Sequence, residues 1–101
     1  MRVRLTQSAL ADVRDIAEFV AANDPVRAMS FADELLDAAE EIGGQPRAYP
    51  QRRQWGAGIR VCFYGFYAII FRLRAEDIVI LRIVNAARDL SRLMGDPPAE
   101  D

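Results

Sequence analysis

The segment Asn23-Asp24-Pro25 constrains the fold of this 101-residue chain most strongly, because it separates two stretches with helical periodicity. Asp24 suits the position before a helix, where its side chain accepts a hydrogen bond from a free backbone N–H. Pro25 suits the first helical turn, where no N–H is needed. Apolar residues recur at steps of three and four over residues 10–20 and again over 28–42. The sequence therefore predicts two amphipathic helices that pack as an antiparallel hairpin.

The ends of these helices also have sequence signals. Ser8 is expected to cap the first helix, because its hydroxyl can accept from the free N–H groups of the first turn. Gly43-Gly44 is expected to end the second helix by adopting a left-handed conformation, which costs glycine nothing sterically.

The rest of the chain carries strand signals. Gly65-Phe66 separates two runs rich in β-branched and aromatic residues, as in a tight hairpin. Ala75-Glu76-Asp77 then separates the second run from a third, and both alternating faces of this third run are largely apolar, which predicts a strand covered on both sides. The expected strands are residues 3–6, 59–64, 67–74 and 77–85, followed by a short helix at 86–94.

These elements predict an α+β fold, with an N-terminal strand, an antiparallel helical hairpin over one face of a three-stranded antiparallel meander, and a short C-terminal helix. One domain is expected over residues 1–94, with 95–101 as a flexible tail. The connecting loop, residues 45–58, is rich in Pro, Gly and Arg. Trp55 within it is either a core anchor under the loop, which is the preferred interpretation, or an exposed binding aromatic.

The residue types that are missing exclude several kinds of chemistry. The chain has no His and no Lys, so it lacks the commonest general base and the residue of Schiff-base and P-loop chemistry. Its single cysteine, Cys62, allows neither an internal disulfide nor a cysteine-rich zinc site. No Ser or Cys has a candidate base beside it. We therefore expect no metal, no cofactor and no catalytic nucleophile.

Membrane and export signals are also missing from the sequence. No stretch approaches the roughly 20 apolar residues of a membrane span. The first residues lack the apolar region of a signal peptide. A cytoplasmic location without a membrane partner is the expectation.

Charge is divided unevenly along the chain. The net charge is −2, yet residues 1–45 hold four Arg against nine acids, and residues 46–92 hold nine Arg against three acids. The second part can therefore meet an acidic protein surface or a phosphate backbone. Because every basic side chain is Arg, planar bidentate contacts are favoured over point charges.

Arginines on the predicted sheet are the main candidates for binding. Arg60, Arg72 and Arg82 lie on three successive strands, and Arg88 begins the last helix next to Asp89. With nearby aromatic residues they have the composition of a nucleic-acid site or a protein-binding hot spot. The alternative is a structural role, in which Arg72 and Arg82 pair with carboxylates on the helices and Arg88 pairs with Asp89.

Several motifs, in their order and spacing, resemble a known family. They are the run from Leu5 to Ile16, Asn23-Asp24-Pro25, Gly58-Ile59-Arg60, the run from Tyr64 to Arg72, and the run from Asp77 to Asp89. Over residues 3–90 the chain closely resembles the ParE branch of the ParE/RelE toxin superfamily. One position departs from the pattern, since Asn85 stands where the family often has His.

The resemblance implies the toxin of a bacterial type II toxin–antitoxin pair with the RelE/ParE-like fold and a plasmid- or chromosome-stabilising role. It implies a hetero-oligomer with a cognate antitoxin, ParD-like or another small DNA-binding protein, whose C-terminal segment wraps the toxin as helix and strand. DNA would then be contacted only indirectly, through the antitoxin. ParE-like toxins poison DNA gyrase without an enzymatic activity of their own, so growth inhibition by protein contact is expected.

The RelE branch implies a different activity, which is ribosome-dependent mRNA cleavage. Arg60 and Arg88 match two basic positions of that branch, and proton transfer would fall to Tyr64 or Tyr67. Tyr67 also stands where that branch has an Arg, and Met94 stands near its C-terminal Tyr, so RNA cleavage is the less favoured alternative. A third alternative is a homologue that is no longer toxic and serves only as the antitoxin's binding and corepressor module.

Two sets of contact residues follow from the sequence and the resemblance. The expected target contacts are Arg60, Arg82, Arg88, Asp89, Arg92 and Trp55. The expected antitoxin contacts are Arg52, Arg53, Tyr67, Arg72, Phe31 and Leu35. An Arg-rich sheet and a groove beside the helical hairpin suit an extended, partly acidic peptide that folds on binding.

Overall fold

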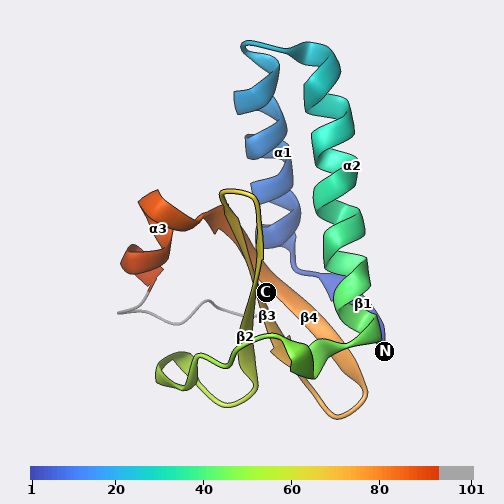
Figure 1. Cartoon of the computed structure of the whole chain (residues 1–101), viewed down its shortest axis with the longest axis vertical. Helices are drawn as coiled ribbons and strands as arrows, with labels where there is room; N and C mark the ends of the chain where they lie inside the picture. The colour runs from blue at the N-terminus through green and yellow to red at the C-terminus, as the bar shows by residue number, and fades with distance from the viewer. Residues whose placement is uncertain (94–101) are drawn as a thin grey trace.

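The computed structural model describes residues 1–93, so Met94 and the expected tail at 95–101 lie outside the described part of the chain. The predicted α+β fold is confirmed (Figure 1). None of the helices in residues 1–93 is both long and apolar enough to cross a membrane. In chain order the elements are β1 (Arg2–Leu5), α1 (Gln7–Ala21), α2 (Pro25–Glu41), β2 (Ile59–Tyr64), β3 (Tyr67–Leu73), β4 (Asp77–Asn85) and α3 (Ala86–Leu93).

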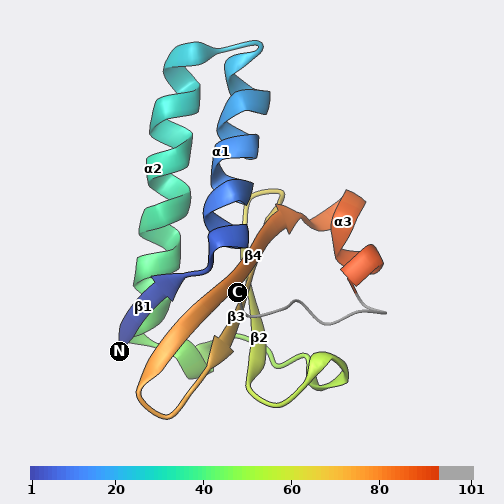
Figure 2. The same cartoon turned by 180° about the vertical axis from the view of Figure 1, so that it is seen from behind.

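The four strands form one sheet in the order β1-β4-β3-β2. β2, β3 and β4 make the predicted antiparallel meander, and β1 pairs in parallel with β4. The helical hairpin of α1 and α2 rises from the sheet, and its tip projects well beyond the strands (Figures 1 and 2). β4 is therefore a central strand, whereas β1 and β2 are the edges.

Each face of the sheet has its own apolar layer. The first layer packs buried residues of α1 and α2, such as Ile16 and Leu35, against the sheet. The second lies on the opposite face and includes Trp55 with partly buried residues of α3. β4 contributes to both layers, with Ile80 in the first and Leu81 in the second, which confirms a strand covered on both sides.

The start of α1 differs from the sequence prediction, because Thr6 and not Ser8 caps the helix. Thr6 Oγ1 accepts a hydrogen bond from the Ala9 N–H at 3.0 Å. The same hydroxyl donates to the Leu81 carbonyl at 2.9 Å, and Thr6 is 1% exposed. Thr6 is placed at the helix start by the preceding strand, so a contact with β4 decides which residue is the cap.

A β-bulge in β4 explains why the hydroxyl of Thr6 is needed. Ile70 of β3 pairs with Arg82, but the next residue, Phe71, pairs with Ile80, so Leu81 is an extra residue in β4. The bulge falls where β1 ends, since Leu5 is paired with Ile80. Beyond this point the edge of β4 has no neighbouring strand, and side chains of α1 and its cap bind its backbone groups instead.

Glycine conformations correct a second expectation. Within residues 1–93, positive φ values occur only at Gly56, Gly58 and Gly65, so Gly43 does not supply a left-handed cap. α2 runs into a 3-10 turn over Ile42–Gly44. Gly43 is required by a close approach, because a Cβ there would lie 2.5 Å from the Met1 carbonyl oxygen. Gly65, at φ 56°, makes the tight β2–β3 turn that the sequence predicts.

The connecting loop is closely packed against the sheet. It contains 3-10 turns at Pro46–Ala48 and Arg53–Trp55, and Gln51 forms a bridge with Arg60 of β2. Trp55 is 3% exposed within the second apolar layer, so the preferred interpretation of a core anchor is confirmed. The same burial corrects the inclusion of Trp55 among the target contacts.

Replacement of Thr6 tests the role of the bulge. Thr6→Val removes a helix cap and leaves the buried Leu81 carbonyl without its donor, so we expect unfolding free energy to fall by about 2–3 kcal/mol. Thr6→Ser keeps the hydroxyl and should lose less than about 1 kcal/mol. Urea denaturation of both variants measures the difference. A larger loss in Thr6→Ser than in Thr6→Val would show that the methyl group, and not the hydroxyl, is important.

Candidate target-binding site

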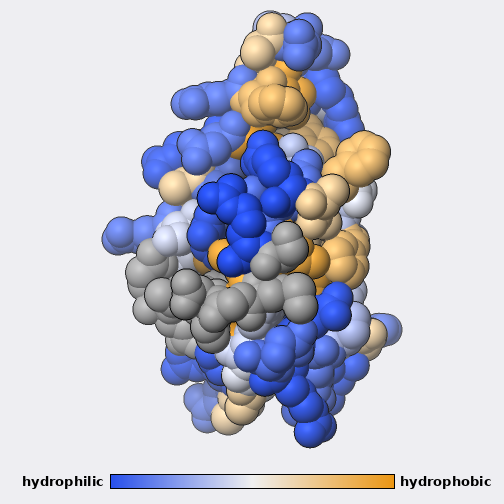
Figure 3. Space-filling model, turned by 90° about the vertical axis from the view of Figure 1, so that its left-hand side faces the viewer, coloured by the Kyte–Doolittle hydropathy of each residue, from blue (hydrophilic) through white to orange (hydrophobic). Residues whose placement is uncertain are grey.

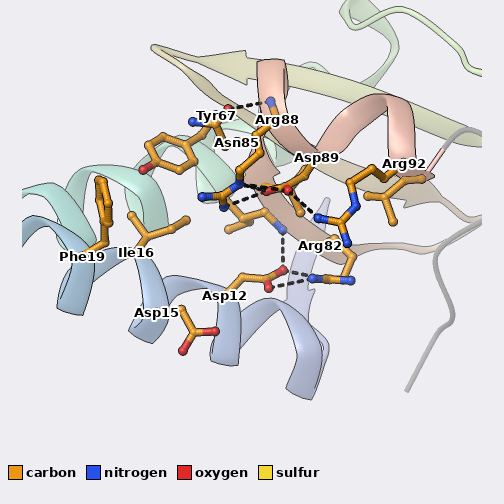
Figure 4. Close-up of a pocket in the computed structure, with 13 residues that line it drawn as sticks. Asp12, Asp15, Ile16, Phe19, Tyr67, Arg82, Asn85, Arg88, Asp89 and Arg92 are labelled. Carbon is orange, nitrogen blue, oxygen red and sulfur yellow. Dashed lines mark hydrogen bonds and ion pairs between the residues drawn. The ribbon is translucent and has the colours of Figure 1, made fainter.

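A pocket of about 600 Å³ lies between α1, the end of β4 and α3 (Figure 4). Its wall combines apolar side chains from α1 with charged side chains from all three elements. The residues around it are Asp12, Asp15, Ile16, Phe19, Tyr67, Arg82, Ile83, Val84, Asn85, Arg88, Asp89, Arg92 and Leu93.

The floor of the pocket is built on an ion pair between α1 and β4. Asp12 accepts from Arg82 through two hydrogen bonds, from Nε at 2.7 Å and from Nη2 at 2.9 Å. The same carboxylate accepts from the backbone N–H of Ile83 at 2.9 Å. Its side chain is 12% exposed, so these bonds replace most of its contact with water. Asp12 thereby fixes α1 against the unpaired edge of β4.

α3 is positioned by a cap and by apolar packing. The side-chain oxygen of Asn85, the last residue of β4, accepts from the Arg88 N–H at 2.9 Å. Leu90 and Leu93 pack on the second apolar layer. Asn is a favoured capping residue, so the departure from the family's His at this position has a structural role here.

The outer side of α3 carries a charged cluster of Arg88, Asp89 and Arg92. Arg88 binds both oxygens of Asp89, with Nε at 3.0 and 3.1 Å and Nη2 at 2.9 Å. Arg92 lies 3.5 Å from the other side of the same carboxylate. Asp89 is 19% exposed, but the two arginines are 70% and 76% exposed. Asp89 therefore holds two arginines that present most of their surface to solvent.

Protonation equilibria in this cluster follow the same contacts. Hydrogen bonds from Arg88, and the charges of Arg88 and Arg92, lower the pKa of Asp89 despite its partial burial. The hydrogen bond and charge of Asp89 in turn raise the pKa of Arg88. Asp89 therefore stays ionised and Arg88 stays protonated, as an ion-pairing surface requires, and the lowered pKa makes the Asp89 carboxylate a weaker base.

Apolar residues flank this charged surface. Phe19 of α1 lines the pocket and is 68% exposed, whereas Ile16 beside it is buried. Figure 3 shows hydrophilic side chains gathered in the middle of this side of the molecule, with hydrophobic ones above them toward the tip of the helical hairpin. A partner would therefore meet exposed arginines beside an aromatic surface, which is the composition of protein-binding hot spots.

A second network joins α2 to the β2–β3 hairpin beside the pocket. Tyr64 donates to Glu34 at 2.6 Å, and Arg27 forms an ion pair with the same carboxylate. Phe31 contacts the rings of Tyr64 and Tyr67, with centroids 6.1 and 5.6 Å apart. The hydrogen bond to Glu34 and burial raise the pKa of Tyr64, and Arg27 and Tyr64 lower that of Glu34. Tyr64 is thus held in its protonated form.

The structure brings together part of the expected target set. Arg82, Arg88, Asp89 and Arg92 all line the pocket. Arg60 lies elsewhere, where Nη1 donates to the carbonyls of Tyr49 at 2.8 Å and Arg47 at 3.4 Å. The carboxylate pairings considered for Arg82 and Arg88 are present, since Arg82 binds Asp12 and Arg88 binds Asp89. Arg72 donates to the carbonyl of Ala57 in the loop.

The expected antitoxin contacts do not form one surface. Phe31 and Tyr67 touch each other on the helix side of the sheet. Leu35 has no exposed surface, which corrects its assignment as a contact residue: it belongs to the core between the helices and the sheet. Arg52 and Arg72 lie toward the opposite face, and Arg53 is exposed in the adjoining turn.

The four residues that mRNA cleavage would require are also spread apart. Tyr67 and Arg88 share the pocket, but Tyr64 is bound to Glu34 of α2. Arg60 is paired with Phe71, four residues along β3 from Tyr67, or about 13 Å. Within residues 1–93, no group of three His, Cys, Asp or Glu side chains is arranged to hold a metal ion.

Sequence reasoning missed the residues that α1 brings to the pocket. The sequence does not single out Asp12, which accepts from Arg82, 70 positions away. Phe19 does carry a sequence signal, because it falls outside the apolar stripe of α1. A large aromatic side chain at such a position adds to an exposed apolar patch, which is typical of a binding surface.

The architecture defines the class of protein. It is similar to the structure described as the chromosomal ParDE toxin–antitoxin system from P. aeruginosa, with a TM-score of 0.73 and 20% identity, covering 84% of this chain and 95% of that one. It is also similar to the toxin–antitoxin complex RelBE2 from Mycobacterium tuberculosis, with a TM-score of 0.62 and 24% identity, covering 83% and 95%. The fold is thus that of the ParE/RelE toxins.

A match between the sequence and a family model identifies the family. The family model described as the ParE toxin of the type II toxin–antitoxin system parDE matches residues 3–90. The chain belongs to this family and is a ParE-family toxin. No match was found among curated protein sequences.

Removal of the Asp12 carboxylate tests the floor of the site. Asp12→Ala removes the carboxylate that accepts from Arg82 and from the Ile83 N–H, so we expect a loss of about 2–3 kcal/mol in unfolding free energy. Asp15→Ala, on the same helix and exposed, should change it by less than about 0.5 kcal/mol. Denaturant titration measures both. A small effect of Asp12→Ala would mean that water replaces the carboxylate.

Acidification tests whether the ion pairs of Asp89 stabilise α3. Because the pKa of Asp89 is lowered in the folded state, its stabilisation is complete above about pH 4, the ordinary pKa of Asp, and is lost as the pH falls through the lower folded value. We expect hydrogen-exchange protection of α3 to decrease in that range, and Asp89→Asn to show the decrease already at pH 7. Unchanged protection in Asp89→Asn would assign the anchoring to the Asn85 cap and to the packing of Leu90 and Leu93.

Proposed function

We propose that this ParE-family toxin inhibits growth by binding DNA gyrase through the charged surface of α3 and the pocket beside it. The observation that carries the proposal is the arginine pair on α3. Asp89 orients Arg88 and Arg92, yet most of each guanidinium surface remains exposed. An arginine already held in place loses less conformational entropy when it binds a partner.

Family membership and the separation of the four candidate catalytic residues within residues 1–93 both favour contact over catalysis. Tyr64 is held protonated by Glu34, and Arg60 binds loop carbonyls far from Arg88. Tyr67 and Arg88 do share the pocket, and this single observation keeps mRNA cleavage as the second candidate function. The remaining candidate, a non-toxic antitoxin-binding homologue, would retain the fold but leave growth unaffected.

The experiment that separates these functions uses purified full-length protein and induced expression. Gyrase poisoning predicts reduced supercoiling and more gyrase–DNA cleavage complexes in vitro. Unchanged gyrase activity together with ribosome-phased cuts in primer extension would favour mRNA cleavage. Unaffected growth after expression without an antitoxin would favour the non-toxic alternative.

We also propose that a cognate antitoxin neutralises the toxin by covering the aromatic surface near the β2–β3 turn. Phe66 is 83% exposed in that turn and Phe63 is 50% exposed beside it, which is unusual for side chains of this size. The Phe66 carbonyl accepts from the Ala86 N–H at 2.8 Å, so the turn adjoins the start of α3. An antitoxin anchored here would reach the α3 surface and block it.

Variants of α3 test the target surface. Arg88→Ala and Arg92→Ala should each reduce gyrase inhibition by at least about tenfold, because truncated hot-spot arginines cost about 2 kcal/mol or more. Both residues are exposed, so folding should be retained. Arg14→Ala, an exposed arginine on α1, is the matched control. Full activity of both α3 variants would exclude this surface as the target site.

Replacement of Phe66 tests the antitoxin surface. Phe66→Ala removes an exposed anchor without disturbing the core, and we expect antitoxin affinity to fall by about tenfold or more. Val26→Ala, at an exposed apolar position near the tip of the helical hairpin, should leave it unchanged. Isothermal titration with the antitoxin encoded beside the toxin measures both. The opposite ranking would move the antitoxin to the helical tip.

A further inference from the structure

A row of arginines crosses the face of the sheet opposite the helical hairpin. Arg4 of β1 is paired with Val79, Val79 with Arg72, and Arg72 with Ile59. The next neighbour is Arg52 in the loop, whose N–H donates to the Ile59 carbonyl at 2.8 Å. Paired residues share a face, and Val79 and Ile59 belong to the second apolar layer, so the three arginines of the row lie on that face.

The row extends to one corner of the sheet. Arg2 lies two residues from Arg4 and so on the same face, and it is paired with Asp77 at the start of β4. Arg74 forms an ion pair with Asp77 at 3.1 Å. A hollow of about 380 Å³ lies at this corner, lined by Arg2, Arg74, Ala75, Glu76 and Asp77.

Three arginines of this surface have charge to offer a partner. In residues 1–93, Arg2, Arg4 and Arg52 form no ion pair, and Arg2 and Arg4 are exposed. The Nε of Arg52 is buried and has no hydrogen-bond partner there. Arg72 and Arg74 already have partners. They contribute mainly positive electrostatic potential to this surface, and less to direct hydrogen bonding. The row therefore concentrates positive charge in a protein whose net charge is −2.

We propose that this arginine row binds the phosphate backbone of duplex DNA directly. This goes beyond the proposed function, and it differs from the sequence expectation that DNA is contacted only through the antitoxin. Strands lie about 4.8 Å apart, so the row spans about 19 Å, which corresponds to about six base pairs of duplex. The row itself consists of strand and loop residues, and contacts with phosphates carry no sequence information, so we expect binding that is independent of base sequence.

The composition of the row favours duplex DNA over an acidic peptide or a single strand. Ile59 and Val79 between the arginines are completely buried, so a peptide would find no apolar anchor in the row. Trp55 is buried as well. The exposed Phe63 lies four residues from Ile59 along β2, or about 13 Å from the row. Single-stranded binding relies on exposed aromatic platforms, whereas contact with duplex phosphates requires only the arginines.

Fluorescence anisotropy with a labelled 20-base-pair duplex tests the proposal, using the full-length toxin without gyrase or antitoxin. We expect micromolar binding at 50 mM salt, weakening steeply as salt rises. Arg4→Gln/Arg52→Gln should weaken binding by about tenfold or more and reduce the slope of log K against log salt by about 1.8. The control Arg14→Gln/Arg47→Gln makes the same change in net charge away from the row and should bind as the wild type does.

Several outcomes would overturn the proposal. They are no duplex binding by the wild type at 50 mM salt, equal losses in the two double variants, and tighter binding of a single strand or of a polyglutamate peptide than of the duplex. If the double variant fails to fold by circular dichroism, Arg4→Gln alone, at an exposed edge position, should reduce the slope by about 0.9. Because gyrase is absent, a failure here leaves the proposed function untouched, and the reverse also holds.

Discussion

The hydrogen bonds of Asp12 to Arg82 and to the Ile83 N–H are the interaction on which the site depends. β1 is too short to pair with the whole of β4, and the bulge at Leu81 leaves backbone groups of a central strand without a strand partner. Thr6 and Asp12, at the cap and in the second turn of α1, bind those groups. The helix is thereby fixed at the end of β4, and the space between it and α3 becomes the pocket.

The geometry of residues 1–93 supports the proposed binding role. The carboxylate of Asp89 holds Arg88 and Arg92 in place while leaving them exposed, and the phenol of Tyr64 is engaged by Glu34. Three surfaces of the protein differ in the side chains that they expose. Exposed aromatic residues lie at the β2–β3 turn, arginines paired with Asp89 lie on α3, and a row of arginines crosses the face of the sheet opposite the helical hairpin. A ParE-family toxin could thus meet different partners with different surfaces.

Much of the fold could be predicted because its signals are local. Asp24-Pro25, the periodicity of α1 and α2, and Gly65 in the β2–β3 turn each act through neighbouring residues, and the structure agrees with them. Predictions failed where a distant contact intervened. Thr6 displaced Ser8 as the cap because it could also reach Leu81, and Gly43 was needed to admit Met1 and not to turn the helix. Leu35 was assigned to a partner although its position on the apolar stripe already indicated the core.

The sequence by itself determined the two helices, the meander, the α+β class and the family, because periodicity, turn residues and motif order are all written in residues close together along the chain. It also placed Arg60, Arg72 and Arg82 on the strands and Arg88 at the start of the last helix. Only the tertiary structure decided their roles. Sequence spacing could not show that Arg82 meets Asp12, or that Arg4 and Arg52 lie in one row, because strand order and the bulge in β4 set those neighbours. Whether an arginine supports the fold or is offered to a partner depends on the carboxylates that folding brings beside it.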